Sequence, residues 1–268
     1  MKREEIQPRL NELLKELKEV FEEHGLRYSL HGGTLLGAAV YKGFIPWDDD
    51  IDIGMPRPDY NKLIELAKEG KLKNTLHCLE LNKKYKYLFA KYCDDKTYVV
   101  EKLSAAGNFG LWVDIFPLDG LGNTFEESEA LLKRLKWTSN LYWATITPMH
   151  IRWLFLIPPL TPLFFMWRFW FNRLNREALS RDYESHKYVG RLSGSIKKKQ
   201  IKDRAKYYEN MIMMPFEDTE YAAPEKYHDW LVQEYTEKYL IPQPEHERKI
   251  HNYKAYEILE SKPQEEQK

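Results

Sequence analysis

Apolar residues near the start of the chain recur at three- and four-residue steps, the spacing of one face of a helix. These positions are Leu10, Leu13, Leu14, Leu17, Val20 and Phe21. The pattern stops at Gly25, a residue type that often ends helices. Residues 26–30 predict a short strand that leads into two glycines, and residues 34–40 suit a short helix. The first forty residues therefore predict a helix, a strand and a second helix.

Alternation of apolar and polar residues indicates that the next elements are strands. Ile51 and Ile53 alternate with carboxylates, which is the two-residue period of a strand. Residues 56–70 begin with prolines and end in glycine, as a capped helix would. Further strand-like runs lie at 76–81, 85–92, 97–100 and 111–118, and a long helical pattern covers 124–146.

This order of elements predicts an α+β fold, in which a mixed β-sheet is flanked by helices and the C-terminal part is mostly helical. We expect a catalytic core over residues 1–122, a helical part over 123–255 packed on that core, and a frayed tail over 256–268. A chain of 268 residues is long enough to bury such a core.

The most apolar run of the chain is IRWLFLIPPLTPLFFMWRFWFNRL, at residues 151–174. Three prolines interrupt it, so it does not predict one helix that spans a membrane. Its aromatic residues and flanking arginines suit a hairpin that lies in one leaflet, and a buried helical hairpin is the alternative. The basic residues of 176–206 fit attraction to anionic lipid head groups or to a polyanionic acceptor, or simply a solvated face.

Composition narrows the class of protein. The formal net charge is zero, which argues against binding of nucleic acid by bulk electrostatics. The two cysteines, Cys78 and Cys93, match neither a disulfide framework nor a zinc knuckle. The first helix is charged and has no apolar signal core, so we expect a cytoplasmic protein.

Acidic residues concentrate at the predicted second strand. Asp50 and Asp52 lie two residues apart, so both side chains project from the same face and could share a divalent cation. Oxygen ligands suit Mg²⁺ or Mn²⁺. Asp48 has the same parity and could also reach the metal, whereas Asp49 points away. Asp114, which alternates with apolar residues on a later strand, is the best candidate for a third carboxylate.

The glycines before this strand supply a second half of the site. Gly32, Gly33 and Thr34 follow a strand and open a helix, and backbone N–H groups at such a position bind phosphate. Alone, this triplet is also compatible with an ordinary turn. Combined with the paired carboxylates and with Asp114, it predicts metal-assisted phosphoryl or nucleotidyl transfer.

The motifs GGTLLG, KGFIPWDDDIDI and WVDIFPLDG resemble those of the LicD and fukutin-related family of the nucleotidyltransferase-fold superfamily. The blocks MPRPDYNKL and YAAPEKYHDWLVQEYTEKYLIPQPEHERKIHN are similar to later blocks of that family. The resemblance implies a nucleotidyltransferase-like sheet, a metal pair at Asp50 and Asp52, and a third carboxylate at Asp114. The chain departs from the family pattern at Val40, where a basic residue is usual, and at Tyr235-Thr236, where Tyr-Gly is usual.

The resemblance also implies an activity. Bacterial relatives transfer phosphocholine from CDP-choline to a sugar hydroxyl of a surface glycan precursor and release CMP. We therefore expect a phosphocholine transferase that acts on a lipid-linked teichoic acid or similar glycan, peripherally on the inner face of the cell membrane. Another CDP-alcohol donor (phosphoethanolamine or a polyol phosphate), a nucleotidyltransferase, and a non-catalytic membrane-associated scaffold are the alternatives.

Aromatic and basic residues near the motifs are candidates for substrate contacts. Choline is a quaternary ammonium, which proteins bind with aromatic rings. Trp112 shares a strand face with Asp114 and is the first candidate for this contact, and Trp47 is another, with core packing as the alternative for both. Lys91 and Arg57 could bind phosphate, or could lie on a solvated surface.

Overall fold

The computed structural model describes residues 1–101, 109–146, 166–193, 196–248 and 253–258. A mixed sheet forms its centre, with strand order β1-β2-β6-β4-β3. These strands are β1 (Ser29–Leu30), β2 (Ile51–Pro56), β6 (Trp112–Gly122), β4 (Ala90–Cys93) and β3 (Thr75–His77). Strands β2 and β6 run parallel, and the other neighbours on this path are antiparallel. The predicted mixed sheet is thus confirmed.

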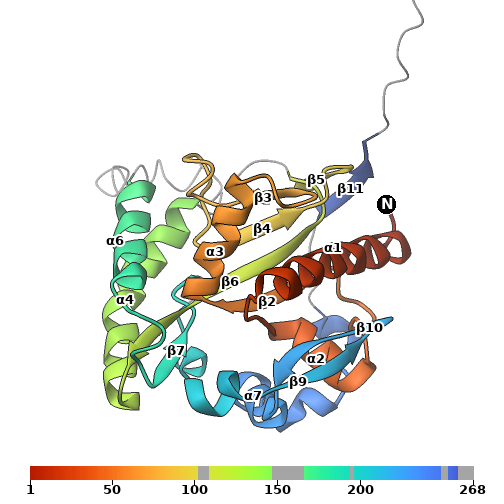
Figure 1. Ribbon diagram of the computed structural model, residues 1–268. Coiled ribbons are helices and arrows are strands. Elements are labelled where there is room, and N and C mark those ends of the chain that lie inside the picture. The colour runs from red at the N-terminus through yellow and green to blue at the C-terminus, as the bar shows by residue number, and fades with distance from the viewer. Residues whose placement is uncertain (102–108, 147–165, 194–195, 249–252, 259–268) are drawn as a thin grey trace, which may run out of the picture.

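Two helices, α1 (Arg3–His24) and α3 (Arg57–Lys68), lie across one face of this sheet (Figure 1). The apolar stripe of α1 is buried against the strands, and the helix ends at Gly25 in the left-handed conformation, as its sequence predicts. Ile51 and Ile53 of β2 and Val113 and Ile115 of β6 have no exposed surface. Because side chains alternate along a strand, the residues between them project from the opposite face.

A second group of elements lies next to β1 and β2. It consists of α2 (Gly32–Tyr41), α7 (Tyr227–Tyr235) and the hairpin of β9 (Met211–Phe216) and β10 (Thr219–Pro224) (Figure 1). Helix α2 begins at Gly32, two residues earlier than the sequence indicates, so both glycines belong to its first turn. Strand β11 (Tyr253–Glu257) pairs with β5 (Thr97–Glu101), and thereby returns the end of the described chain to the core.

The long helices α4 (Phe125–Ile146) and α6 (Trp167–Leu179) pack side by side at the far end of β6 (Figure 1). Leucines of α4 and Phe171 and Leu174 of α6 form a separate apolar cluster. Residues 151–165 of the apolar run lie outside the described residues. In the part of the chain that is described, no helix combines the length and the hydropathy needed to cross a bilayer.

The C-terminal part contains more strand than the sequence predicts. Strand β7 (Tyr188–Gly190) pairs with the end of β6, and β8 (Lys202–Asp203) pairs with β7. Single helical turns complete this part, at Lys198–Gln200, Ala205–Glu209, Glu237–Leu240 and Glu245–Glu247. The strands after residue 187 are two to six residues long, which is too short for a clear alternation of apolar and polar residues.

Candidate active site

Three charged side chains meet on the face of the sheet opposite α1 and α3. Asp52 on β2 is in register with Asp114 on β6, and Lys91 on β4 is in register with Asp114 from the other side. The Lys91 Nζ atom donates a hydrogen bond of 2.7 Å to Oδ1 of Asp114. Both side chains are at least 88% removed from solvent. Burying two charges at the centre of a sheet costs their hydration, and their mutual attraction only partly offsets this cost.

The first turn of α2 lies directly against Asp52. The His31 N–H donates to the Asp52 carbonyl oxygen at 3.0 Å, and the Asp52 N–H donates to Thr34 Oγ1 at 2.8 Å. Gly32 has φ +53°, and a Cβ atom there would lie 2.7 Å from Oδ2 of Asp52. A Cβ on Gly33 would lie 2.9 Å from Oδ2 of Asp48. The positive φ of Gly32 favours glycine, and a side chain at either position would have to displace a carboxylate.

The acidic segment before β2 is fixed in place from two sides. Gln7 Nε2 of α1 donates to the Asp48 carbonyl at 2.9 Å, and the Tyr253 hydroxyl donates to the Asp49 carbonyl at 2.9 Å. The Asp48 side chain hydrogen-bonds with Asp50. Burial raises the pKa of Asp48, and the nearby charges of Asp52 and Asp49 raise it further. Negative charge is therefore concentrated beside the first turn of α2.

These carboxylates have the chemistry of a site for a hard cation. All donors are oxygen atoms, and the charges of Asp52 and Asp49 act on Asp48. Among the residues that the structure describes, no three His, Cys, Asp or Glu side chains converge as a complete metal site. This arrangement fits Mg²⁺, which proteins commonly bind through one or two carboxylates while substrate phosphates and water complete the coordination.

A cavity of about 600 Å³ opens beside the acidic segment. We call it the Trp47 pocket. Its lining residues are Gly33, Leu36, Tyr41, Ile45, Trp47, Asp48, Lys199, Tyr235, Lys238, Tyr239, Ile241, Pro242, Gln243 and Pro244. The pocket thus joins the α2 turn to a wall formed by α7 and by the chain that follows it. Its volume is in the range of pockets that hold small molecules.

The other predicted substrate contacts fall in different surroundings. Trp47 lines the pocket. Trp112 is buried on the same strand face as Asp114, as the alternation along β6 predicts. The Lys91 ammonium lies 3.8 Å from the centre of the Trp112 ring. Arg57 is also buried, and its guanidinium binds both carboxylate oxygens of Asp119, at 2.6 and 2.8 Å. Its contact with phosphate stays a prediction.

Lys202 provides a pH test of the core behind α2. Its Nζ atom lies 4.1 Å from the Trp230 ring centre and 3.9 Å from Glu234, and burial lowers its pKa from 10.5 to about 7. Between these values the unfolded chain binds a proton that the folded protein lacks, so stability rises with pH.

We expect Lys202→Met to raise the free energy of unfolding at pH 7, because the cost of burying the ammonium is fully present below its folded pKa and has only begun to fall at that pKa. The difference in unfolding free energy between the variant and the wild type should shrink by up to about 1.4 kcal/mol per pH unit as the pH rises towards 10. Urea unfolding of the variant and the wild type at pH 7, 8 and 9 measures this difference. A constant difference across this range would contradict the assigned pKa.

Thr236, at the end of α7, has a backbone conformation that favours glycine. Its φ is 66° and its ψ is 175°. A side chain in this region costs of order 1–3 kcal/mol. This chain has Tyr235-Thr236 at a place where the LicD and fukutin-related family usually has Tyr-Gly. The backbone conformation gives a physical reason for that glycine.

We expect Thr236→Gly to raise the free energy of unfolding by about 1 kcal/mol, because relief of strain exceeds the greater entropy of glycine in the unfolded chain. Thr236→Ala is the matched control, since it removes the hydroxyl but keeps Cβ. Urea unfolding measures both variants. If alanine and glycine change stability equally, backbone strain is not the cause.

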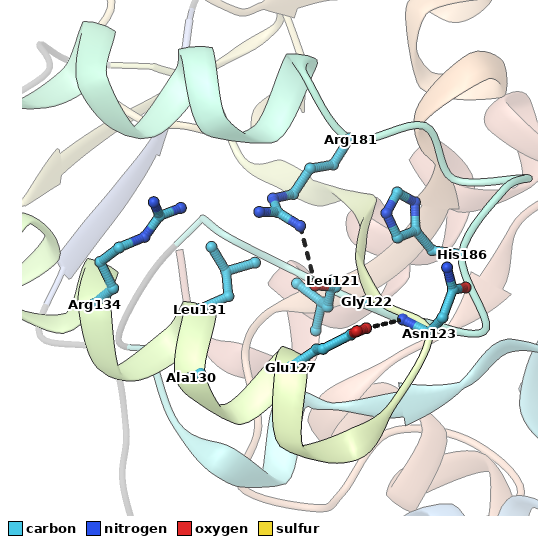
Figure 2. A pocket seen from close by; sticks show the side chains of 9 residues that line it. All are labelled: Leu121, Gly122, Asn123, Glu127, Ala130, Leu131, Arg134, Arg181 and His186. Atoms are coloured by element: carbon cyan, nitrogen blue, oxygen red, sulfur yellow. Dashed lines mark hydrogen bonds between the residues drawn. The ribbon is translucent and has the colours of Figure 1, made fainter.

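A second cavity, of about 440 Å³, lies at the other end of β6 (Figure 2). Its charged side chains already have partners in the protein. Arg181 donates to the Leu121 carbonyl at 3.1 Å, and Glu127 accepts from the Asn123 N–H at 2.9 Å. Arg134 pairs with Glu177 at 2.9 Å. The carboxylates and the α2 turn, which form the candidate site, are at the opposite end of the strand.

Comparison with known proteins identifies the segment that carries this geometry. Residues 25–154 match the family model described as LicD/FKTN/FKRP, nucleotidyltransferase domain. We call these residues, just under half of the chain, the LicD-family domain after the model that they match. Its range contains α2, β2, β4 and β6, and therefore all three strands that align Asp52, Asp114 and Lys91. The family resemblance of the sequence is confirmed.

Two relatives illustrate the activities found with this domain. The chain is 26% identical to lipopolysaccharide cholinephosphotransferase LicD of Haemophilus influenzae over 245 residues, which is 89% of this chain and 91% of that protein. It is 42% identical to human ribitol 5-phosphate transferase FKRP over 57 residues, which is 21% of this chain and 12% of that protein. Both names describe transferases of a substituted phosphate, and this chain is a phosphotransferase homologue of the same kind.

Sequence reasoning missed one wall of the Trp47 pocket. Lys199, Tyr235 and Lys238 lie outside the LicD-family domain, between 85 and 124 residues from Asp114 in sequence. Tyr235 and Lys238 belong to the later block that resembles the family, but nothing in the sequence of that block indicates that they line a pocket. Only the packing of α7 beside α2 brings them to the domain.

Proposed function

We propose that this protein is a divalent-metal-dependent phosphocholine transferase. It moves phosphocholine from CDP-choline to a sugar hydroxyl of a lipid-linked glycan, such as a teichoic acid precursor, and releases CMP. The alignment of Asp52, Asp114 and Lys91 beside the first turn of α2 carries this proposal. The likeness to the Haemophilus influenzae cholinephosphotransferase over most of both chains supports choline as the head group.

Each part of the site has a role in this reaction. The N-terminal N–H groups of α2, at Gly32, Gly33 and Thr34, face the pyrophosphate. Asp50 and Asp52 would hold Mg²⁺ or Mn²⁺, with Asp48 and Asp114 as the alternative carboxylates and with substrate phosphate and water completing the coordination; the ion would neutralise phosphate charge. Asp114 orients the acceptor hydroxyl and takes its proton, and the ammonium of Lys91 balances the charge of Asp114.

The transfer exchanges one bond for another. The acceptor oxygen forms a bond to the phosphorus that bears choline, and the bond from that phosphorus to the oxygen of CMP breaks. Positioning and electrostatics supply most of the rate enhancement in such a reaction, because phosphoryl transfer needs little covalent chemistry from the protein.

A panel of donors tests the proposal. The protein is incubated with Mg²⁺, a glycolipid extract and either CDP-choline, CDP-ethanolamine or CDP-ribitol, and CMP release is followed by chromatography. We expect release from CDP-choline that stops with EDTA. Release from CDP-ribitol alone would favour the polyol phosphate alternative. The local similarity to ribitol 5-phosphate transferase is the observation that supports this alternative. Release that continues in EDTA would contradict the metal requirement.

The proposed acceptor is attached to a lipid, so we also propose that the protein meets an anionic membrane surface through α6. Phe169 on this helix is 49% exposed, and the arginines at 168, 173 and 176 are exposed around it. Flotation with vesicles that contain anionic lipid tests this contact. Phe169→Ala should reduce recovery with the vesicles, whereas Tyr256→Ala, at an equally exposed aromatic on β11, should not. Equal recovery of all three proteins would contradict it.

A further inference from the structure

Cationic side chains of the protein contact two aromatic rings of the Trp47 pocket. The Arg248 guanidinium lies over the Trp47 ring, with its central carbon 4.2 Å from the ring centre. The Lys199 ammonium lies 5.5 Å from the centre of the Tyr235 ring, and the exposed Lys238 completes the wall. Two aromatic residues of the pocket therefore already bind cations of the protein itself.

A quaternary ammonium binds to aromatic faces through the attraction of its charge to the ring. In this pocket, however, the Trp47 and Tyr235 rings are already contacted by Arg248 and Lys199, and the exposed Lys238 adds another like charge. The carboxylates of Glu234 and Glu245 are paired with Lys199 and Arg248, and Asp48 lines the pocket as well. A nucleoside phosphate has the opposite requirements. Its planar base stacks on aromatic rings irrespective of charge, and its phosphate is attracted by lysine and arginine.

The pocket is also built to keep its shape. Arg248 Nε donates to the Gln243 carbonyl at 3.1 Å, so the same guanidinium holds both the Trp47 ring and the segment that closes the pocket. Lys199 is fixed by Glu234, at 2.7 Å from its carboxylate. A wall with fixed geometry lowers the entropic cost of binding a ligand.

We propose that the Trp47 pocket binds the nucleotide half of the donor, so that the alcohol head group lies outside it. The pocket meets the first turn of α2 at Gly33 and Asp48, which is where the pyrophosphate would join the two halves. This assignment rests on the proposed function for the identity of the donor, but its evidence is the chemistry of the pocket. It makes the C-terminal part, beyond the LicD-family domain, responsible for recognition of the leaving nucleotide.

Binding of the separate halves tests the assignment without turnover. CMP and choline chloride are each titrated into the whole protein with Mg²⁺, and heat and tryptophan fluorescence are recorded. We expect CMP to bind and Lys238→Ala and Trp47→Leu each to weaken it at least tenfold. Lys96→Ala, which removes an exposed lysine from another surface, should leave CMP affinity unchanged. Thermal melting of each variant shows that it is folded.

The outcomes separate this inference from the proposed function. If CMP affinity is the same in the wild type, Lys238→Ala and Trp47→Leu, or if choline affinity falls in the two pocket variants while CMP affinity does not, the assignment is overturned. If CMP binds as expected but no CDP-alcohol is turned over, the pocket assignment stands and the proposed function fails.

Discussion

Asp52→Asn should lower the rate of transfer by about 10³-fold or more while the fold stays intact. Asparagine has nearly the same shape, and the backbone hydrogen bond from residue 52 to Thr34 does not depend on its side chain. The substitution removes the charge that faces the α2 turn, and with it the proposed binding of the cation and of phosphate. The measurement is CMP release per folded protein, with thermal melting as the test of folding.

Asp49→Asn is the matched control for this prediction. Asp49 belongs to the same acidic run but has the opposite parity, and its carbonyl is held by Tyr253. We expect the control to keep most of its activity. The site is wrongly placed if Asp52→Asn retains activity within threefold of the wild type, or if Asp49→Asn loses as much as Asp52→Asn.

Arg57→Ala should have the largest effect on stability, a loss of about 3–5 kcal/mol in the free energy of unfolding. The side chain of Asp119 is only 1% exposed, and it accepts two hydrogen bonds from the Arg57 guanidinium. Removal of the arginine leaves that carboxylate buried without its partner. Urea unfolding of the variant measures the loss.

The double variant Arg57→Ala, Asp119→Ala tests the cause, since it removes both charges and should recover part of the stability. Steady-state kinetics distinguishes this structural role from the phosphate contact that the sequence also allows. If Arg57→Ala raises KM for the donor tenfold with unchanged stability, Arg57 contacts substrate and the ion pair is not its main role.

Local patterns predicted those parts of the fold that depend on neighbouring residues. The helical period of residues 10–21 and the alternation around Asp52 and Asp114 are properties of single elements, so the sequence showed them directly. Which carboxylates meet is a property of strand register. The alignment of Asp52 with Asp114, and of Lys91 with Asp114, comes from pairing across gaps of 62 and 23 residues, which no single segment specifies.

The environment of charged residues was less predictable. Arg57 and Lys91 are both basic residues near the motifs, and sequence alone suggested the same role for them. The structure gives Arg57 a buried partner in Asp119, and gives Lys91 a partner in Asp114 at the candidate site. This difference arises because β6 is buried along its whole length, so every charge on it needs a partner from a neighbouring element.

The most direct test of the account is to follow both halves of the donor at once. CDP-choline that carries ³H in cytidine and ¹⁴C in choline is incubated with the protein, Mg²⁺ and the lipid-linked glycan fraction of the producing cells. The account predicts that ¹⁴C enters the glycan fraction while an equal amount of ³H appears as CMP, and that Asp52→Asn abolishes both. Entry of ³H into the glycan fraction would show nucleotidyl transfer and contradict the account.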